Sequence, residues 1–491
     1  MRLKIKPIEL FAGRPVSILN VNTAHKLNVH VDERVSVSKG FNHEKKKIIS
    51  VVDTASKLIG QNEIAVSKEI LEALDTRSGA YVDVRLAQEP ISTHMIRKKL
   101  DNKRLSQKEI KKIIEDIVTN ALTETEIAYF ISAVYKCGMS QKEIGFLIGA
   151  MVDVGKKIKF KGKVVDKHSI GGVAGNRTTP LVVAICSAAG LKVPKTSSRA
   201  ITSSAGTADV LEAISNVEFS ISQIKKIVEK TNACMVWGGS LGLSPADDKL
   251  IQIERILHLD PKPQLLASVL SKKISVGSKY VIIDIPYGKG AKVAKSEALK
   301  LKKQFEKFGK KFNLKLKAVL TDGSQPIGNG VGPFLEIQDI MAILERRTER
   351  PKDLEKKAVF LAGELLELSG KTKEGEKLAL SILNSGKALE KFKQIIKAQG
   401  GAIPKKFPKT KYTYTIKAKR AGKIKYIDNK KINTMGSLAG SPADNSAGLY
   451  LHLHVKEKVK KDTSLITIHT QSKTRLKDVK SFYKRSEPIK Y

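Results

Sequence analysis

The spacing of hydrophobic and polar residues changes twice along the chain. Up to about residue 90, short β-branched runs such as RPVSILNV, LNVHV and AYVDVRL are separated by Gly, Asn and Asp, which is typical of strands joined by turns. From Met95 onward, apolar residues recur every three or four positions, which predicts amphipathic helices. From Gly162 onward, β-branched runs alternate with glycine-rich turns and helical segments, which predicts an α/β layer with a largely parallel sheet.

Helix start signals support the second pattern. In a capping box, a Ser or Thr at the N-cap and a Glu three residues later satisfy backbone N–H groups reciprocally. Three such pairs precede apolar-periodic segments: Ser106 with Glu109, Thr123 with Glu126, and Ser140 with Glu143. We therefore expect three successive helices in a bundle.

The α/β pattern occurs four times. Its four segments are KVVDKHSIGGVAGNRTTPLVVAICSAAG, LKVPKTSSRAITSSAGTADVLEAI, SKYVIIDIPYGKGAKVAKSEALKLKKQFEKFG and KAVLTDGSQPIGNGVGPFLEIQDIMAIL. In parallel sheets, ligands bind beyond the carboxyl ends of the strands, where these glycine-rich turns lie. After Lys405, alternating strands return in YTYTIKAKRAGKIKYI, GLYLHLHV and SLITIHT.

These patterns together predict an α/β multidomain fold. Gln88, Glu89 and Pro90 form a plausible linker after the first domain. We expect a β-rich N-terminal domain at 1–90, a helical bundle at 91–160 joined by part of 210–260, an α/β phosphate-binding core at 161–400, and a C-terminal α+β domain at 401–491.

Composition narrows the class of protein. A hydrophobic share of 41% with 28% charged residues is that of a soluble globular protein. The net charge of +40 could indicate a nucleic-acid surface, but lysine is spread over the whole chain, which favours solvated helix faces. The longest apolar run, LVVAICSAAGL at 181–191, is too short to cross a bilayer, and the N-terminus lacks a signal-peptide pattern. We expect a cytoplasmic protein without a membrane or nucleic-acid partner.

Metal and disulfide chemistry is not indicated. Cys137, Cys186 and Cys234 are odd in number and far apart, so each is expected to be a small buried hydrophobe. His452, His454 and His469 fall in predicted strands, where a structural role is expected since no further ligand has metal spacing.

The stretch DKHSIGGVAGNRTTP, Asp166–Pro180, has the properties of an anion site. Three glycines allow backbone N–H groups to approach an anion, the following helix start adds partial positive charge, and Lys167 adds a full one. Thr179 and Pro180 suit an N-cap and first helical position. Neither the GxxxxGK[ST] nor the GxGxxG order is present, and a plain tight turn before a helix remains the alternative.

Two further turns have similar chemistry. TSSRAITSSAGT at 196–207 gathers hydroxyl groups around Arg199, which suits an oxyanion or a sugar, although a solvated Ser/Thr turn has the same composition. PYGKGAK at 286–292 adds Lys289 and Lys292 beside two glycines. Three such turns on one sheet favour a shared anion site.

At this point the chain resembles a known family. DKHSIGGVAGN is similar to the DKHSTGGVGD motif of thymidine and pyrimidine-nucleoside phosphorylases, and SSRAITSSAGTADVLE to their S-G-R-x-x-x-x-T-G-G-T-x-D-x-L-E segment. ASVLSKKISVGSKYVIIDIPYGKGA at 267–291 is similar to their ASILSKK…D-V-K-x-G-x-G-A block. TSSRAITS is typical of the archaeal AMP phosphorylase branch, which also has an additional N-terminal domain. Ile253 stands where the thymidine enzymes have the arginine that holds the pyrimidine ring.

The resemblance implies phosphorolysis of a nucleoside monophosphate. AMP and phosphate would give adenine and ribose 1,5-bisphosphate, with CMP and UMP as further possible substrates. Orthophosphate would be a co-substrate and no cofactor is implied. The relatives are dimers through the helical domain, so a homodimer or larger homo-oligomer is expected.

Site residues follow from the same resemblance. The attacking phosphate would be held by Lys167, Ser169, Ser198 and Thr207. The ribose phosphate would be lined by Gly172 and by the loop of Ser198, Arg199, Ala200, Ile201, Thr202 and Ser203. Ser268 and Lys272 match base-contacting positions, and Lys292 is a candidate for the 5′-phosphate.

Two residues would take part in the chemistry itself. Asp260 matches the proton donor to the departing base, although an aspartate in a turn before a proline has the same local sequence. Donation near neutrality would require a raised pKa, since an ordinary aspartate titrates at about 3.9. His168 would orient the attacking oxygen, or stack as a structural residue.

Two other functions remain open on the sequence. The first is a thymidine or pyrimidine-nucleoside phosphorylase. The second is a nucleic-acid-binding protein on the same fold, which would bind with steep salt dependence.

Overall fold

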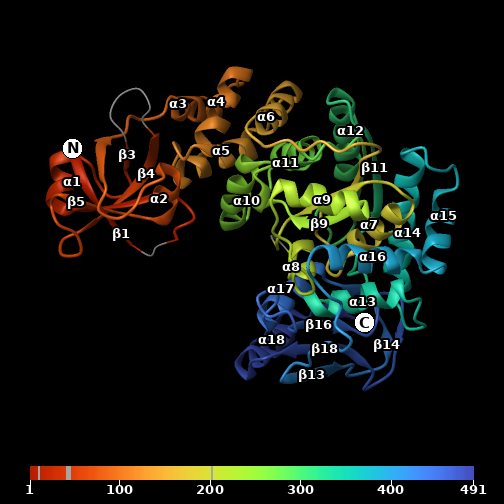
Figure 1. The fold of residues 1–491 in the computed structure, drawn as a ribbon. Coiled ribbons are helices and arrows are strands. Elements are labelled where there is room, and N and C mark those ends of the chain that lie inside the picture. The colour runs from red at the N-terminus through yellow and green to blue at the C-terminus, as the bar shows by residue number, and fades with distance from the viewer. Residues whose placement is uncertain (9–10, 40–45, 201–202) are drawn as a thin grey trace. The chain divides into compact units, whose positions relative to one another are not determined.

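The computed structural model describes residues 1–8, 11–39, 46–200 and 203–491 (Figure 1). They form two compact units. The first comprises Met1–Val154 and Pro245–Ala267, and the second comprises Gly155–Ser244 and Ser268–Tyr491.

The first unit begins with a closed β-barrel whose strand order is β1-β5-β2-β4-β3-β6. In β1, Leu3 and Ile5 are buried and their neighbours are exposed, so the barrel interior takes every second side chain. Two short helices, α1 and α2, complete it. The bounds are β1 (Arg2–Pro7), β2 (Val16–Asn20), α1 (Val21–Leu27), β3 (Arg34–Lys39), β4 (Lys46–Ala55), β5 (Glu63–Val66), α2 (Lys68–Leu74) and β6 (Tyr81–Leu86).

The strand predicted for LNVHV at 27–31 is wrong. Helix α1 occupies the preceding residues, because the Asn20 side chain accepts a hydrogen bond from the Asn22 backbone N–H as its N-cap. Asn28 then ends the helix in the left-handed conformation, with φ of 52°. The strands predicted within RPVSILNV and AYVDVRL are confirmed as β2 and β6.

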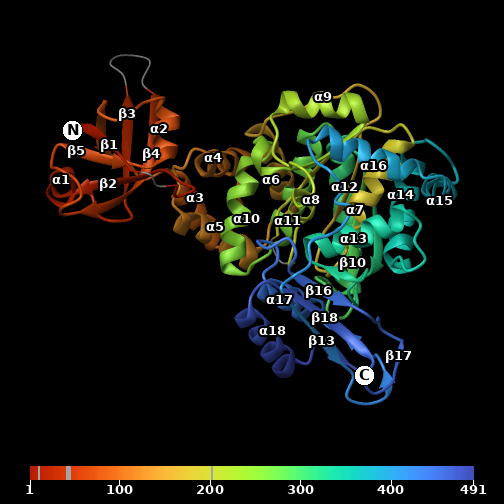
Figure 2. The same ribbon diagram turned by 60° about the horizontal axis from the view of Figure 1, so that its bottom comes forward.

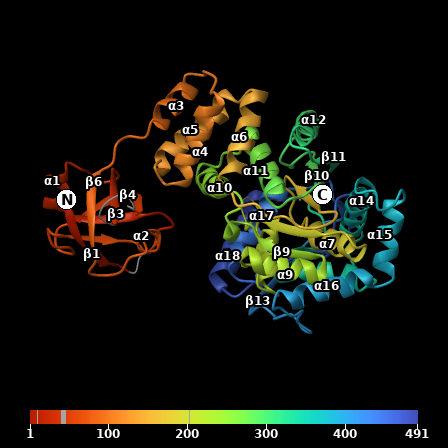
Figure 3. The same cartoon turned by 45° about the horizontal axis from the view of Figure 1, so that its top comes forward.

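Helices α3, α4, α5, α6 and α10 of the first unit gather in one bundle (Figure 3). All three predicted capping boxes are confirmed, at the N-termini of α4, α5 and α6. Helix α10 packs on α4 and α5, and its Lys249 donates to the carbonyls of Ile117 and Val118 at the end of α4, at 2.8 and 2.9 Å. The bounds are α3 (Ser92–Leu100), α4 (Gln107–Val118), α5 (Glu124–Cys137), α6 (Gln141–Asp153) and α10 (Pro245–Leu257).

The second unit contains the α/β core. Its strands form a parallel sheet of order β11-β10-β7 and a parallel pair β8-β9, linked by a bridge between Val164 and Lys192. All four predicted strand, turn and helix segments are present, and β9 is an addition to them. The strands are β7 (Val165–Ser169), β8 (Val193–Ser197), β9 (Ala233–Trp237), β10 (Tyr280–Tyr287) and β11 (Lys315–Asp322).

Helices pack against this core through their apolar residues. Helix α7, for example, buries ten successive residues from Thr178 to Ser187 between β7, α14 and α16. The bounds are α7 (Thr178–Ala188), α8 (Thr207–Glu212), α9 (Ile221–Thr231), η1 (Gly239–Leu241), α11 (Lys262–Ser275), α12 (Lys295–Lys311), α13 (Pro333–Leu344), α14 (Lys352–Leu368), α15 (Gly375–Asn384) and α16 (Lys387–Ala398).

The C-terminal part of the second unit is α+β, as expected (Figure 2). A four-stranded sheet of order β12-β16-β18-β13 packs beside α17 and α18. The bounds are β12 (Gly330–Val331), β13 (Tyr412–Lys417), β14 (Gly422–Lys423), β15 (Tyr426–Ile427), α17 (Asn429–Ala439), β16 (Gly448–Leu451), β17 (Lys458–Val459), β18 (Ser464–Thr470), α18 (Lys473–Ser486) and β19 (Ile489–Lys490).

Candidate functional site

The first and third predicted loops lie side by side. Strands β7 and β10 are parallel neighbours, with Ser169 opposite Asp284, so both loops leave the same edge of the sheet. Gly172 has φ of +88°, and a Cβ added to it would lie 2.8 Å from the Cβ of Lys292. Only glycine therefore lets the 170–177 turn and the 288–292 turn approach each other this closely.

Lys167 is buried on β7, at the start of the first loop. Its Nζ donates to the hydroxyl oxygens of Thr178 and Thr179, at 2.8 and 3.4 Å, and burial lowers its pKa to about 8. Helix α7 begins at Thr178, so the prediction of Thr179 as N-cap and Pro180 as first helical residue is wrong. The N-cap is Arg177, because both threonine hydroxyls turn toward Lys167. Thr178 was not predicted as a site residue. The sequence does show its hydroxyl group next to that of Thr179 at the same helix start.

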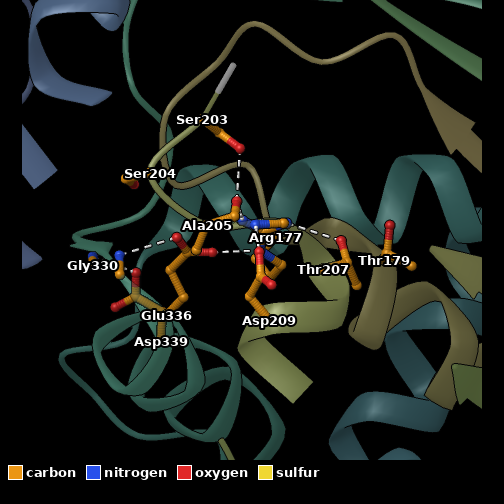
Figure 4. A network of polar contacts seen from close by, with 12 residues as sticks. Arg177, Thr179, Ser203, Ser204, Ala205, Thr207, Asp209, Gly330, Glu336 and Asp339 are labelled. Atoms are coloured by element: carbon orange, nitrogen blue, oxygen red, sulfur yellow. Dashed lines mark hydrogen bonds and ion pairs between the residues drawn. The ribbon is translucent and has the colours of Figure 1, made fainter. Parts of the chain in front are cut away.

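Arg177 connects the first loop to the second, as Figure 4 shows. Its guanidinium donates to the Thr207 hydroxyl at 2.9 Å and to the Ala205 carbonyl at 2.8 Å, and it pairs with the buried Glu336 of α13. Glu336 in turn accepts from the Gly332 backbone N–H at 3.1 Å. One buried ion pair thus connects the first loop, the second loop and the Gly332 turn before α13.

Asp209 shapes the second loop. Its Oδ2 accepts from the backbone N–H groups of Ala200 and Gly206, both at 2.7 Å. Arg199 makes ion pairs with Glu212, Glu218 and Asp209 and lies over the Trp237 ring at 4.8 Å, so its guanidinium is directed to protein partners.

The remaining residues of the second loop differ in exposure. Ser198 is exposed, and the Ser203 hydroxyl donates to the Ala205 carbonyl at 2.7 Å. Ile201 and Thr202 lie outside the described residues.

The surroundings of His168 favour its neutral imidazole form. Burial and the nearby ammonium groups of Lys273 and Lys195 lower its pKa well below the usual value. The Ser169 hydroxyl, next along the strand, accepts from the Gly171 backbone N–H at 3.4 Å. Positive charge in the loop therefore comes from lysine, and His168 can only exchange a hydrogen bond near neutral pH.

Helix α17 supports the first two loops from the C-terminal part of the chain. Asn429 accepts from the Ala174 backbone N–H at 3.1 Å, and Asn433 accepts from the Ser204 backbone N–H at 3.2 Å. The third loop contacts the same part of the chain, since a Cβ added at Gly290 would lie 2.5 Å from the Tyr426 hydroxyl. The sequence reasoning missed these asparagines.

Asp339 of α13 holds the turn that supports Gly175. Its Oδ2 accepts from the backbone N–H groups of Asn329 and Gly330, at 2.7 and 2.8 Å, and burial raises its pKa to about 7. A Cβ added at Gly175 would lie 2.4 Å from the Ile327 carbonyl oxygen, so this turn and the phosphate loop are in close contact.

A pH-dependent stability follows for Asp339. Because the folded protein binds this proton more tightly than the unfolded chain, its contribution to the free energy of unfolding falls as pH rises from about 4 to about 7, by about 1.4 kcal/mol per unit. Asp339→Asn removes this contribution and keeps an acceptor for both N–H groups. Urea unfolding of the two proteins at several pH values should show the free energy of unfolding of the wild type falling relative to that of Asp339→Asn, with that slope, as pH rises from about 4 to about 7. Parallel curves for the two proteins would exclude the titration.

Of the residues predicted to bind or protonate the base, some belong to the first unit and some to the second. Asp260 is exposed in the first unit, between α10 and α11, and Ile253 is buried there on α10. Ser268 and Lys272 are partly buried on the part of α11 that belongs to the second unit.

The cysteines and histidines outside the loops have structural surroundings. Cys186 and Cys234 are buried as expected, but Cys137 is partly exposed at the end of α5. Within the described ranges, no cluster of His, Cys, Asp and Glu could hold a metal ion, and no helix is long and apolar enough to span a membrane. Of the three histidines predicted to lie in strands, only His469 does, on β18, because β16 ends at Leu451 before His452 and His454. All three bond through ring nitrogens: His452 to Thr467, His454 to Asn329 and His469 to Thr410.

A cavity of about 1460 Å³ lies elsewhere in the second unit. It is lined by residues of α13, α16, β13, β16 and β18 and of the segment 401–410, including Phe334, Phe407 and Tyr450. None of the predicted site residues that the structure describes lines it. We therefore place the candidate site at the three loops, where buried cations and glycine-rich backbone meet.

Three family models match successive parts of the chain. The helical bundle domain of a glycosyl transferase family matches residues 93–155, and the α/β domain of that family matches 161–389. The pyrimidine nucleoside phosphorylase C-terminal domain matches 423–490. A solved structure, anthranilate phosphoribosyltransferase from Thermus thermophilus, covers 62% of the chain and 99% of its own with a TM-score of 0.52 and 18% identity, which supports the fold alone.

Curated relatives match along the whole chain. The AMP phosphorylase of Thermococcus kodakarensis is 42% identical and that of Pyrococcus abyssi 45%, each covering 100% of this chain and 98% of the relative. A candidate thymidine phosphorylase of Legionella pneumophila is 41% identical over 92% of this chain and 87% of its own length. At these identities over full length, the chain belongs to the family of the AMP phosphorylases.

Proposed function

We propose that the protein catalyses phosphorolysis of AMP to adenine and ribose 1,5-bisphosphate. The observation that carries this proposal is the meeting of three anion-binding loops in a chain that matches AMP phosphorylases from end to end. CMP and UMP are further candidate substrates. Orthophosphate is the co-substrate, and no cofactor takes part.

The loops suit the two phosphates of this reaction. Lys167, Ser169, Ser198 and Thr207 bind the attacking orthophosphate, and Thr178 joins them through its contact with Lys167. Gly172 and the 198–203 loop, of which Arg199 and Asp209 fix the shape, line the ribose phosphate. An anion here meets backbone N–H groups and buried ammonium groups, which stabilise it more strongly than water-exposed charges would.

The chemical step exchanges one bond at the anomeric carbon. A phosphate oxygen forms a bond to C1′ while the bond from C1′ to the base nitrogen breaks, and the electron pair leaves with the base. Neutral His168 orients the attacking oxygen, and Asp260 donates a proton to the departing base. Ser268 and Lys272 bind that base on α11.

Lys292 would bind the 5′-phosphate of AMP, which gives a direct prediction. Lys292→Ala should raise the KM for AMP about tenfold and leave that for adenosine nearly unchanged, since one charge-assisted hydrogen bond is lost. Lys289→Ala is the matched control, because the Lys289 ammonium lies over the Tyr426 ring at 5.0 Å. Equal losses for AMP and adenosine would remove Lys292 from the 5′-phosphate site.

A thymidine or pyrimidine-nucleoside phosphorylase is the second candidate, favoured by the Legionella relative. Ile253 argues against this second candidate function, because a buried isoleucine side chain cannot donate hydrogen bonds to a pyrimidine ring. Steady-state rates for AMP, CMP, UMP and thymidine with phosphate test the proposal. Faster turnover of thymidine than of every nucleotide would favour the second candidate.

Two further properties are part of the proposal. The protein acts in the cytoplasm, and it assembles as a homodimer or larger homo-oligomer, as the family resemblance implies. Light scattering after size exclusion measures the assembly, and a monomeric mass would contradict it.

A further inference from the structure

A buried aspartate at the start of the phosphate loop is paired with two lysines. Asp166 of β7 has no exposed surface, and its carboxylate lies 2.5 Å from the Nζ of Lys273 and 3.3 Å from that of Lys195. Lys273 is fully buried and Lys195 nearly so. We call these three residues the Asp166 cluster. One carboxylate thus faces two lysine side chains.

The opposite face of β7 repeats the arrangement. Asp284 of β10 is fully buried, lies 3.1 Å from the Nζ of Lys357 on α14, and accepts from the Thr321 hydroxyl at 2.5 Å. Lys167 interacts electrostatically with both Asp284 and Lys357. We call Lys167, Asp284 and Lys357 the Asp284 cluster. Because Asp166 and Lys167 are adjacent in a strand, the two clusters lie on opposite faces of the sheet.

Other charged groups near the clusters do not supply the missing negative charge. Arg177 is balanced by Glu336, and His168 is neutral. Lys272 adds positive potential at His168, and Cys234 stays a neutral thiol because burial raises its pKa to about 12. Among the described residues of the two clusters, four lysines therefore face two aspartates.

Such an excess is costly in a folded protein. A buried ammonium without a counter-ion loses hydration that the interior does not replace. Burial accordingly lowers the pKa of Lys273 to about 7 and that of Lys167 to about 8, even though each has an aspartate nearby. General lysine enrichment of the surface does not account for the excess, because these side chains are inside the core.

We propose that a phosphate dianion in the loop is the missing counter-ion of both clusters, so that Lys195, Lys273 and Lys357 are positioning residues for phosphate affinity. The inference rests on the proposed function, which places that dianion at the carboxyl end of β7. Lys273 has no exposed surface, so it acts on the phosphate through its field and through Asp166.

Neutral replacements test the clusters. Lys273→Met leaves Asp166 paired one to one with Lys195, so it creates no orphaned carboxylate. Lys357→Met leaves Asp284 with the hydrogen bond from Thr321 and the electrostatic interaction with Lys167. Titration calorimetry should show the Kd for inorganic phosphate about tenfold weaker in each variant. Lys99→Met combined with Glu143→Gln is the matched control, since it removes an equally buried lysine and its partner, 3.1 Å apart in the first unit, without orphaning a carboxylate, and it should leave that Kd unchanged.

A second measurement uses the wild-type protein alone. At pH 8.5 phosphate is already a dianion, so its binding should draw protons onto the buried lysines. The binding heat should then vary with the ionisation enthalpy of the buffer in the sense of proton uptake, and Lys273→Met should reduce the uptake. A structural role of Lys273 would change the free energy of unfolding without changing uptake.

The outcomes separate the two proposals. Phosphate-dependent adenine release by the wild type, together with an unchanged phosphate Kd in folded Lys273→Met and Lys357→Met, would overturn this inference and keep the proposed function. Proton release or no proton exchange on phosphate binding would also overturn it. Adenine release that needs no phosphate would contradict the proposed function itself.

Discussion

Replacing Arg177 by methionine is expected to lower the free energy of unfolding of the second unit by about 3–5 kcal/mol. Glu336, its partner, is 1% exposed, so the variant leaves a carboxylate buried without a cation. The Thr207 hydroxyl loses the hydrogen bond from Arg177 as well, and the Ala205 carbonyl keeps only the one from Ser203. Urea unfolding followed by fluorescence reports on this unit, because the chain's one tryptophan, Trp237, lies on β9.

The matched control removes both charges. In Arg177→Met with Glu336→Gln, the amide oxygen still accepts from the Gly332 N–H and no buried charge is orphaned. At least half of the lost stability should return. A double variant as unstable as Arg177→Met alone would show that the ion pair is not what holds the loops.

Replacing Asp260 by asparagine is expected to lower kcat for AMP phosphorolysis by about 10²- to 10⁴-fold, the usual contribution of a general acid. The amide has a similar shape but cannot donate a proton to the departing base. Because Asp260 lies exposed between α10 and α11, the substitution should leave the fold and the affinity for AMP nearly unchanged. Single-turnover kinetics with AMP and phosphate measure the step.

The assignment of Asp260 has a stricter test. A ribose 5-phosphate that carries a leaving group needing no proton should be cleaved by Asp260→Asn almost as fast as by the wild type. Asp101→Asn, an exposed aspartate after α3 in the same unit, is the matched control. Equal losses on AMP and on the activated substrate would discard the proton-donor role.

The fold could be predicted because its signals are local. Each capping box lies within four residues, and each strand, turn and helix segment of the core is contiguous. The error at 27–31 came from the same source, since β-branched residues suggested a strand where α1 ends at Leu27 and the chain leaves it through the left-handed Asn28. Propensity there was outweighed by side-chain caps.

The site could be predicted only in part. Loops rich in glycine and hydroxyl groups are recognisable in a sequence, and the structure brings the predicted segments of Lys167, Gly172 and Thr207 together. The sequence did not point to the buried lysines Lys195, Lys273 and Lys357. In a chain of net charge +40, nothing in the sequence distinguishes a buried lysine from the many solvated ones. Arg199 was expected to face substrate, and only the structure placed Glu212 and Glu218 around it.

Long-range partners were the other gap. Asn429 and Asn433 reach the loops from about 230 to 255 positions away in the chain. No periodicity or turn chemistry connects such distant residues, so their contribution is visible only in three dimensions.

Adenine release from AMP, measured with and without inorganic phosphate, tests the central claim most directly. We predict release that depends on phosphate and saturates with it, with one ribose 1,5-bisphosphate formed for each adenine. Release at the same rate without phosphate, or none from AMP while thymidine is cleaved, would contradict it.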